Sequence, residues 1–175
     1  MRVRAAVPGD ALAIATVHVR SWKAAYPGLL PDSYLDALRP EDRLGMWEQA
    51  LGEPPPGQGT LVLEHDDAGP GAIAGFASFG PTRDDDADPG VVGELQTLYL
   101  DPDSWGRGGA TRLMDEVVAQ MRAAGFTAAT LWVLDSNAHA RRFYERRGWR
   151  PDGASKLHDW QAFVATDVRY RMPLR

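Results

Sequence analysis

A short run of glycines is the part of this sequence whose residue types point most directly to chemistry. Residues 105–111 read Trp-Gly-Arg-Gly-Gly-Ala-Thr, between an apolar stretch and a stretch with helical spacing. Such a turn gathers free backbone N–H groups at the positive end of the helix dipole. Gly106, Gly108 and Gly109 leave space for an anion, and Arg107 can add a charge-assisted hydrogen bond. The run predicts a phosphate-binding turn, and a tight turn without a ligand is the alternative.

Other familiar sites are excluded by single residues. A P-loop needs Gly-Lys-Ser/Thr, and residues 105–111 contain no lysine. A dinucleotide fingerprint starting at Gly106 needs glycine where Thr111 stands. The acidic stretch 84–88 is not a calcium loop, because Pro89 replaces the required Gly and Leu95 the required Glu. The chain has no cysteine, no Gly-x-Ser-x-Gly elbow and only scattered histidines, so no metal site or activated nucleophile is predicted.

Composition predicts one globular domain spanning residues 1–175. The chain is 25% charged and 44% hydrophobic, with a net charge of −5 and a pI near 5.3. These are globular proportions, and they lack the basic field that binds nucleic acid. A cationic substrate is compatible with the charge. With no signal-peptide core and no apolar run of membrane length, we expect a cytoplasmic protein that binds no membrane.

The first half of the chain predicts helices followed by a hairpin. Residues 2–6 have strand character, and Pro8-Gly9-Asp10 reads as a turn leading into a helix. That helix is expected over 11–25, with Leu12, Ile14, Val17 and Val19 as its apolar contacts. A second helix is expected over 32–50, interrupted near Arg39-Pro40. After a surface connection over 52–59, strands over 60–64 and 72–79 should pair as an antiparallel hairpin.

The second half predicts the elements that position the glycine-rich turn. The apolar run 91–100 reads as a central strand buried on both faces. After the turn, Leu113, Met114, Val117, Val118 and Met121 repeat with helical period, and Gly125 ends that helix. A strand over 128–134, a helix over 138–147 and strands over 162–165 and 168–172 complete the chain. Strand–helix–strand order implies a βαβ crossover, so we predict an α/β fold with a central mixed sheet flanked by helices.

The glycine-rich turn resembles the acyl-CoA motif of the GNAT superfamily of N-acetyltransferases. That motif reads Gln or Arg, two residues, Gly, one residue, then Gly or Ala. Trp105, Gly108 and Ala110 occupy its defined positions, and Trp105 departs from the first of them. Backbone donors that hold a pyrophosphate do not depend on that side chain. The resemblance implies that acetyl-CoA is held by Gly106, Arg107, Gly108, Gly109, Ala110 and Thr111.

Residues 131–149 resemble the second motif of the same superfamily: strand, Asn, Ala, Tyr, Gly-aromatic. Asn137, Ala140 and Tyr144 are spaced by three and four residues, which places them along one helix face. The resemblance implies that this face lines the cofactor groove, with Asn137 bonding the pantetheine arm and Tyr144 near the sulfur. An N-cap asparagine and a packed aromatic are the alternatives. The arginines of this helix, Arg141, Arg142, Arg146 and Arg147, could reach the ribose phosphate or form a solvated face.

Three further residues take roles only through the resemblance. Glu94 lies eleven residues before Trp105, the offset of a general-base glutamate in some family members. An exposed glutamate, or one paired with an arginine, is the alternative. Trp22 and Tyr26 fall where acceptor-site helices lie in the family, so they would wall an acceptor pocket unless they pack in the core.

The implied reaction moves the acetyl group of acetyl-CoA to a primary amine. Glu94 would remove a proton from the amine, and backbone N–H groups of Leu98, Tyr99 or Leu100 would bind the thioester oxygen. Tyr144 would protonate the departing thiolate. Because no cysteine can carry an acetyl group, direct transfer in a ternary complex is favoured.

Several questions stay open at this point. The acceptor is a small-molecule or peptide amine whose identity the sequence does not give, and a homodimer is neither required nor excluded. No metal is expected. A non-catalytic acyl-CoA-binding or sensing module of the same fold is the alternative to an enzyme.

Overall fold

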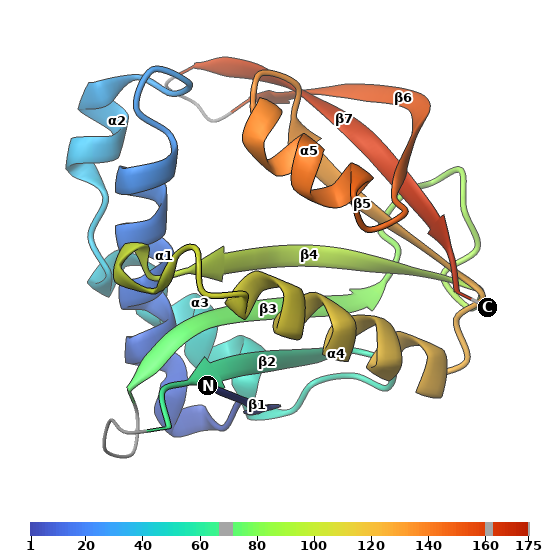
Figure 1. Ribbon diagram of the computed structural model, residues 1–175, viewed down its shortest axis with the longest axis horizontal. Helices are drawn as coiled ribbons and strands as arrows, with labels where there is room; N and C mark the ends of the chain where they lie inside the picture. The colour runs from blue at the N-terminus through green and yellow to red at the C-terminus, as the bar shows by residue number, and fades with distance from the viewer. Residues whose placement is uncertain (67–71, 160–162, 175) are drawn as a thin grey trace.

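The computed structural model describes residues 1–66, 72–159 and 163–174. Within them a seven-stranded sheet has the order β1-β2-β3-β4-β5-β7-β6. The strands are β1 Arg2–Ala5, β2 Gly59–Glu64, β3 Ile73–Pro81, β4 Val92–Leu100, β5 Ala128–Leu134, β6 Arg150–Asp159 and β7 Val164–Pro173. The helices are α1 Ala11–Ala25, α2 Asp32–Ala37, α3 Glu41–Gly52, α4 Gly109–Ala123 and α5 Ala138–Glu145. In Figure 1, α4 and α5 cover one face of the sheet, and α1 and α3 cover the other.

The pairing of the strands confirms the mixed sheet. β2 and β3 form the predicted antiparallel hairpin, and β4 lies at the centre of the strand order. β4 and β5 are parallel and are joined through α4, which is the predicted βαβ crossover. The predicted turn between β2 and β3 includes residues 67–71, which lie outside the described residues.

The central feature of the sheet is a separation of β4 from β5. The two strands pair only from Val92 opposite Ala128 to Leu95 opposite Leu131. Beyond that point β4 continues to Leu100 along β3, whereas β5 continues to Leu134 along β7. A bulge leaves Gln96 between the β4 residues that pair with Ser78 and Phe79. Bulges bend a strand and increase its twist, so this one helps to turn β4 away from β5.

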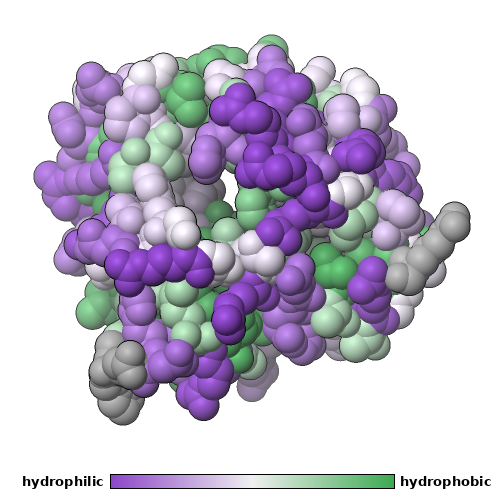
Figure 2. Space-filling view, viewed as in Figure 1, coloured by the Kyte–Doolittle hydropathy of each residue, from purple (hydrophilic) through white to green (hydrophobic). Residues whose placement is uncertain are grey.

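The space between the separated strands reaches the surface. Figure 2 shows the molecule hollowed beside α5, where Figure 1 places the diverging ends of β4 and β5. The prediction that β4 is buried on both faces is therefore correct only for its first half. Residues 92–95 are buried, whereas residues 96–99 are only half-buried. The loss of β5 as a neighbour accounts for the difference.

Apolar clusters on both faces hold the helices on the sheet. Leu113, Val117 and Met121 of α4 are completely buried against one face. On the other face, Ile14 of α1 and Trp47 of α3 pack with Val62 and Phe76. The expectation that Leu12 contacts the core is wrong, since Leu12 is 53% exposed. The apolar stripe of α1 instead follows Ile14, Val17 and Val19.

The predicted helix interruption and helix end are both confirmed. The helical region over 32–50 is divided into α2 and α3, and Leu38 has an extended conformation with ψ of 133°. Pro40 has no backbone N–H, and within a helix its ring would clash with the carbonyl of Asp36, so α2 cannot run on into α3. Gly125 follows α4 with a φ of 92°, a left-handed conformation in which glycine is least strained.

The C-terminal prediction is partly wrong. β7 is one strand over residues for which two short strands were expected, and β6 was not predicted. Most of β6 is exposed and polar, and it includes Pro151 and Gly153, so it lacks the apolar alternation that marks a strand. As an edge strand paired only with β7, it can tolerate these residues. The predicted residue 162 lies outside the described residues.

The junction between α4 and the sheet generates a stability prediction. A Cβ at Gly109 would lie 2.6 Å from Leu63 Cδ2 and 2.8 Å from Leu100 Cδ2, so Gly109→Ala must displace core side chains. We expect a loss of about 1–3 kcal/mol in unfolding free energy, measured by urea denaturation. As control, Gly45→Ala in α3 meets no atom within 4 Å and should stabilise by about 0.5–1 kcal/mol. Equal stability changes in the two variants would contradict this packing.

Candidate active site

The glycine-rich turn presents an uncapped helix N-terminus. Gly108 precedes α4 with a φ of 77°, and no side chain caps the helix. The first backbone bond of the helix runs from Arg112 N to Gly108 O, at 3.2 Å. The N–H groups of Gly109, Ala110 and Thr111 thus lie in the turn whose donors have no intrahelical partner. A Cβ at Gly108 or Gly106 would meet nothing within 4 Å, so the space beside these two glycines is open.

Trp105 contributes a contact that the sequence did not predict. Its indole N–H donates to Leu100 O over 3.1 Å, from the start of the turn back to the end of β4. The side chain therefore fixes the turn to the strand that precedes it. Trp105, which stands where the acyl-CoA motif has Gln or Arg, therefore still makes a hydrogen bond through its side chain.

The side chains just before the glycine-rich turn point alternately to the two faces of the sheet. Leu98 and Leu100 belong to the cluster beneath α4, whereas Tyr99 packs with Trp22 and Phe76 on the opposite side. The β4–β5 register ends at Leu95, so the edge of β4 that faces β5 has no ladder partner beyond it. Backbone N–H groups on that edge are available to an acceptor atom that enters between the strands.

Asn137 and Ala140 lie at the start of α5, as their spacing predicts. Asn137 is the N-cap, and its side-chain oxygen accepts a hydrogen bond from Ala140 N at 3.1 Å. This is the structural role considered from the sequence. The amide nitrogen of Asn137 makes no hydrogen bond within the described part of the chain, so the cap leaves a donor for a second contact.

Tyr144 lies on the same helix and is half-buried among aromatic rings. Its ring centroid is 5.5 Å from that of Phe143 and 6.4 Å from that of Trp149. Burial, and then the proximity of Tyr99, raises the pKa of Tyr144 above its usual value of 10. The phenol is therefore protonated throughout the neutral pH range, which a proton donor requires.

Glu94 is buried and paired with an arginine. It is 2% exposed and lies on β4 in the segment still paired with β5. Arg83 donates to one carboxylate oxygen from its backbone N–H at 3.0 Å and from Nε at 3.2 Å, and to the other oxygen from its terminal guanidinium. The arginine pairing considered from the sequence is thus present, and a proton transfer to Glu94 has to displace one of these bonds.

Trp22 and Tyr26 lie in an aromatic group at the end of α1. Trp22 is buried, with its ring centroid 5.1 Å from that of Tyr26, and the guanidinium of Arg43 lies 5.0 Å from the Trp22 ring centroid. Tyr26 is half-buried, and burial followed by the proximity of Tyr99 raises its pKa well above 10. The structure therefore brings Tyr26, Tyr99 and Tyr144 together at the separation of β4 and β5 from three different elements.

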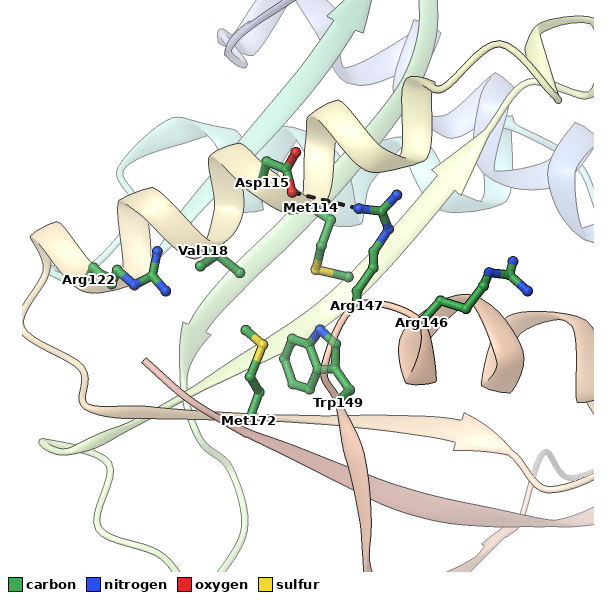
Figure 3. Close-up of a pocket in the computed structure, with 8 residues that line it drawn as sticks. All are labelled: Met114, Asp115, Val118, Arg122, Arg146, Arg147, Trp149 and Met172. Atoms are coloured by element: carbon green, nitrogen blue, oxygen red, sulfur yellow. Dashed lines mark ion pairs between the residues drawn. The ribbon is translucent and has the colours of Figure 1, made fainter. Parts of the chain in front are cut away.

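A pocket of about 380 Å³ lies between α4, the segment that follows α5 and the end of β7 (Figure 3). Arg147 spans it: the guanidinium donates to Thr111 Oγ1, lies 3.8 Å from the Asp115 carboxylate and stacks on Phe143. Arg141 is held by Asp135 and by the Tyr170 hydroxyl at 3.0 Å. Arg141 and Arg147 therefore fix α5 in place, whereas Arg142 and Arg146 are exposed.

The comparisons with known proteins identify the family. Residues 19–149 match the model of the Acetyltransferase (GNAT) family. An uncharacterized N-acetyltransferase, YuaI, of Bacillus subtilis is 31% identical over 136 residues, covering 77% of this chain and 72% of the relative. An uncharacterized N-acetyltransferase of Mycobacterium tuberculosis, Rv2669, is 32% identical and covers 82% and 85% of the two chains.

Solved structures agree on the fold. PaiA N-acetyltransferase from Thermoplasma acidophilum, in complex with coenzyme A, has a TM-score of 0.73 at 19% identity over 98% of both chains. The putative acetyltransferase yncA from Salmonella typhimurium, with acetyl-CoA, has a TM-score of 0.72 at 21% identity over 100% and 94%. The chain belongs to the GNAT family of acetyltransferases.

Sequence reasoning missed two groups at this site. It did not identify Arg83 as the partner of Glu94, and it gave no role to Asp167 or His158, whose side chains meet on β7 and β6. Within the described residues no group of His, Cys, Asp and Glu is arranged to hold a metal ion, and no helix is long and apolar enough to cross a bilayer.

The Arg83–Glu94 pair generates a prediction. Arg83→Met leaves the carboxylate of Glu94 buried with only a backbone N–H as donor, and we expect about 1–3 kcal/mol lower unfolding free energy at neutral pH. Adding Glu94→Gln to that variant removes the charge and should restore part of the loss. A double-mutant cycle measured by urea denaturation gives the coupling between the two residues. If the two losses simply add, the pair is not coupled as its geometry indicates.

Proposed function

We propose that this N-acetyltransferase takes acetyl groups from acetyl-CoA and transfers them directly to a primary amine. The observation that carries the proposal is the position of the uncapped N-terminus of α4 at the end of the separated strand β4. One turn then supplies donors for a pyrophosphate, and the adjoining strand edge supplies donors for a thioester. Relatives of the same fold are solved with coenzyme A and acetyl-CoA, which supports this choice of donor.

The chain's own residues fit such a donor along a continuous path. The N–H groups of residues 109–111 and the side chain of Arg107 would bind the pyrophosphate. The free amide nitrogen of Asn137 would donate to the pantetheine arm, and the β4 edge at residues 98–100 would bind the thioester oxygen. When bound, the cofactor supplies the acetyl group.

Tyr144 is proposed as the acid that protonates the leaving sulfur. Its raised pKa keeps the phenol protonated, and Tyr99 of β4 lies close enough to contribute to that rise after burial. A thiolate released into the same half-buried space is also poorly solvated, which raises its affinity for a proton. The proton then moves from the phenol oxygen to the sulfur as the carbon–sulfur bond breaks.

Glu94 is proposed as the base that takes a proton from the amine, directly or through a water. Its side chain projects from the face of β4 opposite Leu95, the side on which Tyr99 lies. Arg83 covers its carboxylate, and the side chain of Arg83 is 66% exposed and can move aside. The acetyl donor and the amine would then approach from opposite faces of the sheet, which suits direct transfer in a ternary complex.

Binding of the donor is tested by heat denaturation. Saturating acetyl-CoA should raise the melting temperature by about 5–10 °C if its concentration is about 100-fold above Kd. Gly108→Glu should abolish this shift, because a carboxylate repels the pyrophosphate. Gly108→Asn is the matched control: it bears the same left-handed backbone without charge, and we expect it to keep a measurable shift. An unchanged shift in Gly108→Glu would contradict the assignment of the turn.

The two proton carriers are separated by their pH profiles in an assay of CoA release. Glu94→Gln should lower kcat/KM most near neutral pH and recover at high pH, where more amine is already deprotonated. Tyr144→Phe should lower kcat by roughly 10²-fold without such recovery, with little change in acetyl-CoA affinity.

The control for the second variant is Tyr170→Phe. The Tyr170 hydroxyl is bonded to Arg141 and Glu145, and Arg141 keeps its ion pair with Asp135 when that hydroxyl is lost, so this variant should leave kcat near that of the wild type. Near-normal turnover in Tyr144→Phe would remove Tyr144 from the mechanism. A pH-independent defect in Glu94→Gln would leave Glu94 with a structural role alone.

A further inference from the structure

We propose that the buried carboxylate of Asp167 binds a second, non-reacting cationic group of the acceptor, so that the substrate class is a diamine or another amine with an additional positive charge. This inference rests on the proposed function, because it concerns the acceptor side of the same site. Three observations support the proposal: the position of Asp167 in the sheet, the hydrogen-bond partners of its carboxylate, and the aromatic side chains beside it.

Asp167 lies where β5 and β7 continue past the separation. It pairs with Leu134, the last residue of β5, and Leu134 packs with Trp22, Tyr26 and Tyr99. The adjacent pair, Val133 and Val168, packs on the opposite side beneath α4. Asp167 therefore projects toward the face on which the aromatic group lies. Its charge is close enough to contribute, after burial and after Tyr99 itself, to the raised pKa of Tyr26.

Asp167 differs from the other carboxylates of this face in its partners. Glu94 is covered by Arg83, and Asp84, Asp86 and Asp152 all bind Arg169. Asp167 is 8% exposed and is bonded through one oxygen to His158 Nδ1, at 3.1 Å. Its other oxygen accepts no hydrogen bond from any described residue. A buried carboxylate without a permanent cationic partner is costly unless a ligand supplies one.

The side chains around this carboxylate favour a cation. Tyr26 and Tyr99 are uncharged, since burial raises the pKa of each. His18 stacks on Tyr99 at 5.0 Å between centroids, and burial, with the charge of Arg43, lowers its pKa to about 3, so it is neutral. Arg43 itself stacks on Trp22, and Lys156, which lies opposite Asp167 in the β6–β7 register, places its Nζ 3.9 Å from the Trp132 ring centroid. Neither of these two cations forms an ion pair with Asp167. Aromatic faces and an open carboxylate together attract organic cations.

The chemistry distinguishes the bound cation from the reacting amine. The nitrogen that attacks the thioester must be neutral, so a carboxylate that stabilises its ammonium form would oppose the reaction. Asp167 instead suits a charge that persists through the reaction, on a second amine or a guanidinium of the same molecule. Holding that charge places the neutral nitrogen toward the separation of β4 and β5.

The test is calorimetric binding to the protein saturated with coenzyme A, where no transfer can occur. The probes are linear diamines from diaminopropane to diaminohexane, each compared with the monoamine of the same carbon skeleton. At least one diamine should bind the wild type about tenfold to a hundredfold more tightly than its monoamine, as expected for a charge-assisted bond. Asp167→Asn should remove this preference and leave coenzyme A affinity unchanged.

The control variant is Asp86→Asn, which removes one negative charge from the same face at a side chain that is 62% exposed and bound to Arg169. It should keep the diamine preference. Equal binding of every diamine and its monoamine to the wild type would overturn the proposal without need of a variant, and so would a preference that survives in Asp167→Asn. Asp167-dependent diamine binding without acetyl transfer would retain this site and refute the proposed reaction.

Discussion

The early end of pairing between β4 and β5 is the constraint on which the other features of the site depend. Four residue pairs join the two strands, and past Leu95 and Leu131 each strand follows a different neighbour. The backbone groups on the facing edges then have no ladder partners, a state that is tolerated where a ligand or water can reach them. The bulge at Gln96 turns β4 away from β5, and the hydrogen bond between the Ser78 and Thr97 hydroxyls helps to hold β4 on β3 beside it.

In the mechanism proposed above, the separation also divides the donor side from the acceptor side of the sheet. On one face, α4 presents its N-terminus and α5 presents Asn137 and Tyr144. On the other face, the end of α1 and strand β7 bring aromatic rings and Asp167 to the same opening. Because Leu98 and Tyr99 are neighbours that point to opposite faces, one strand serves both sides. The proposed mechanism uses this arrangement, with the acetyl donor and the amine reaching β4 from opposite faces of the sheet.

Sequence alone predicted the elements that carry strong local signals. Helical spacing of apolar residues identified α4, and the left-handed glycines at positions 108 and 125 marked its two ends. The motif containing Asn137 and Tyr144 identified α5. The sequence did not predict β6, because the exposed polar residues of that strand have no periodic signal. It also did not predict the Arg83–Glu94 and Asp167–His158 pairs. These pairs join residues on different elements, so they follow from strand order and register, which local patterns do not specify.

The account is tested most directly by a crystal structure of the protein with coenzyme A. It predicts that the pyrophosphate lies on the N–H groups of residues 109–111 and that the pantetheine arm passes between the separated ends of β4 and β5. The sulfur should lie within hydrogen-bond reach of the Tyr144 hydroxyl, about 3–3.5 Å for an O–H donor to sulfur. A cofactor bound outside this separation, or a sulfur directed away from Tyr144, would contradict the central claim.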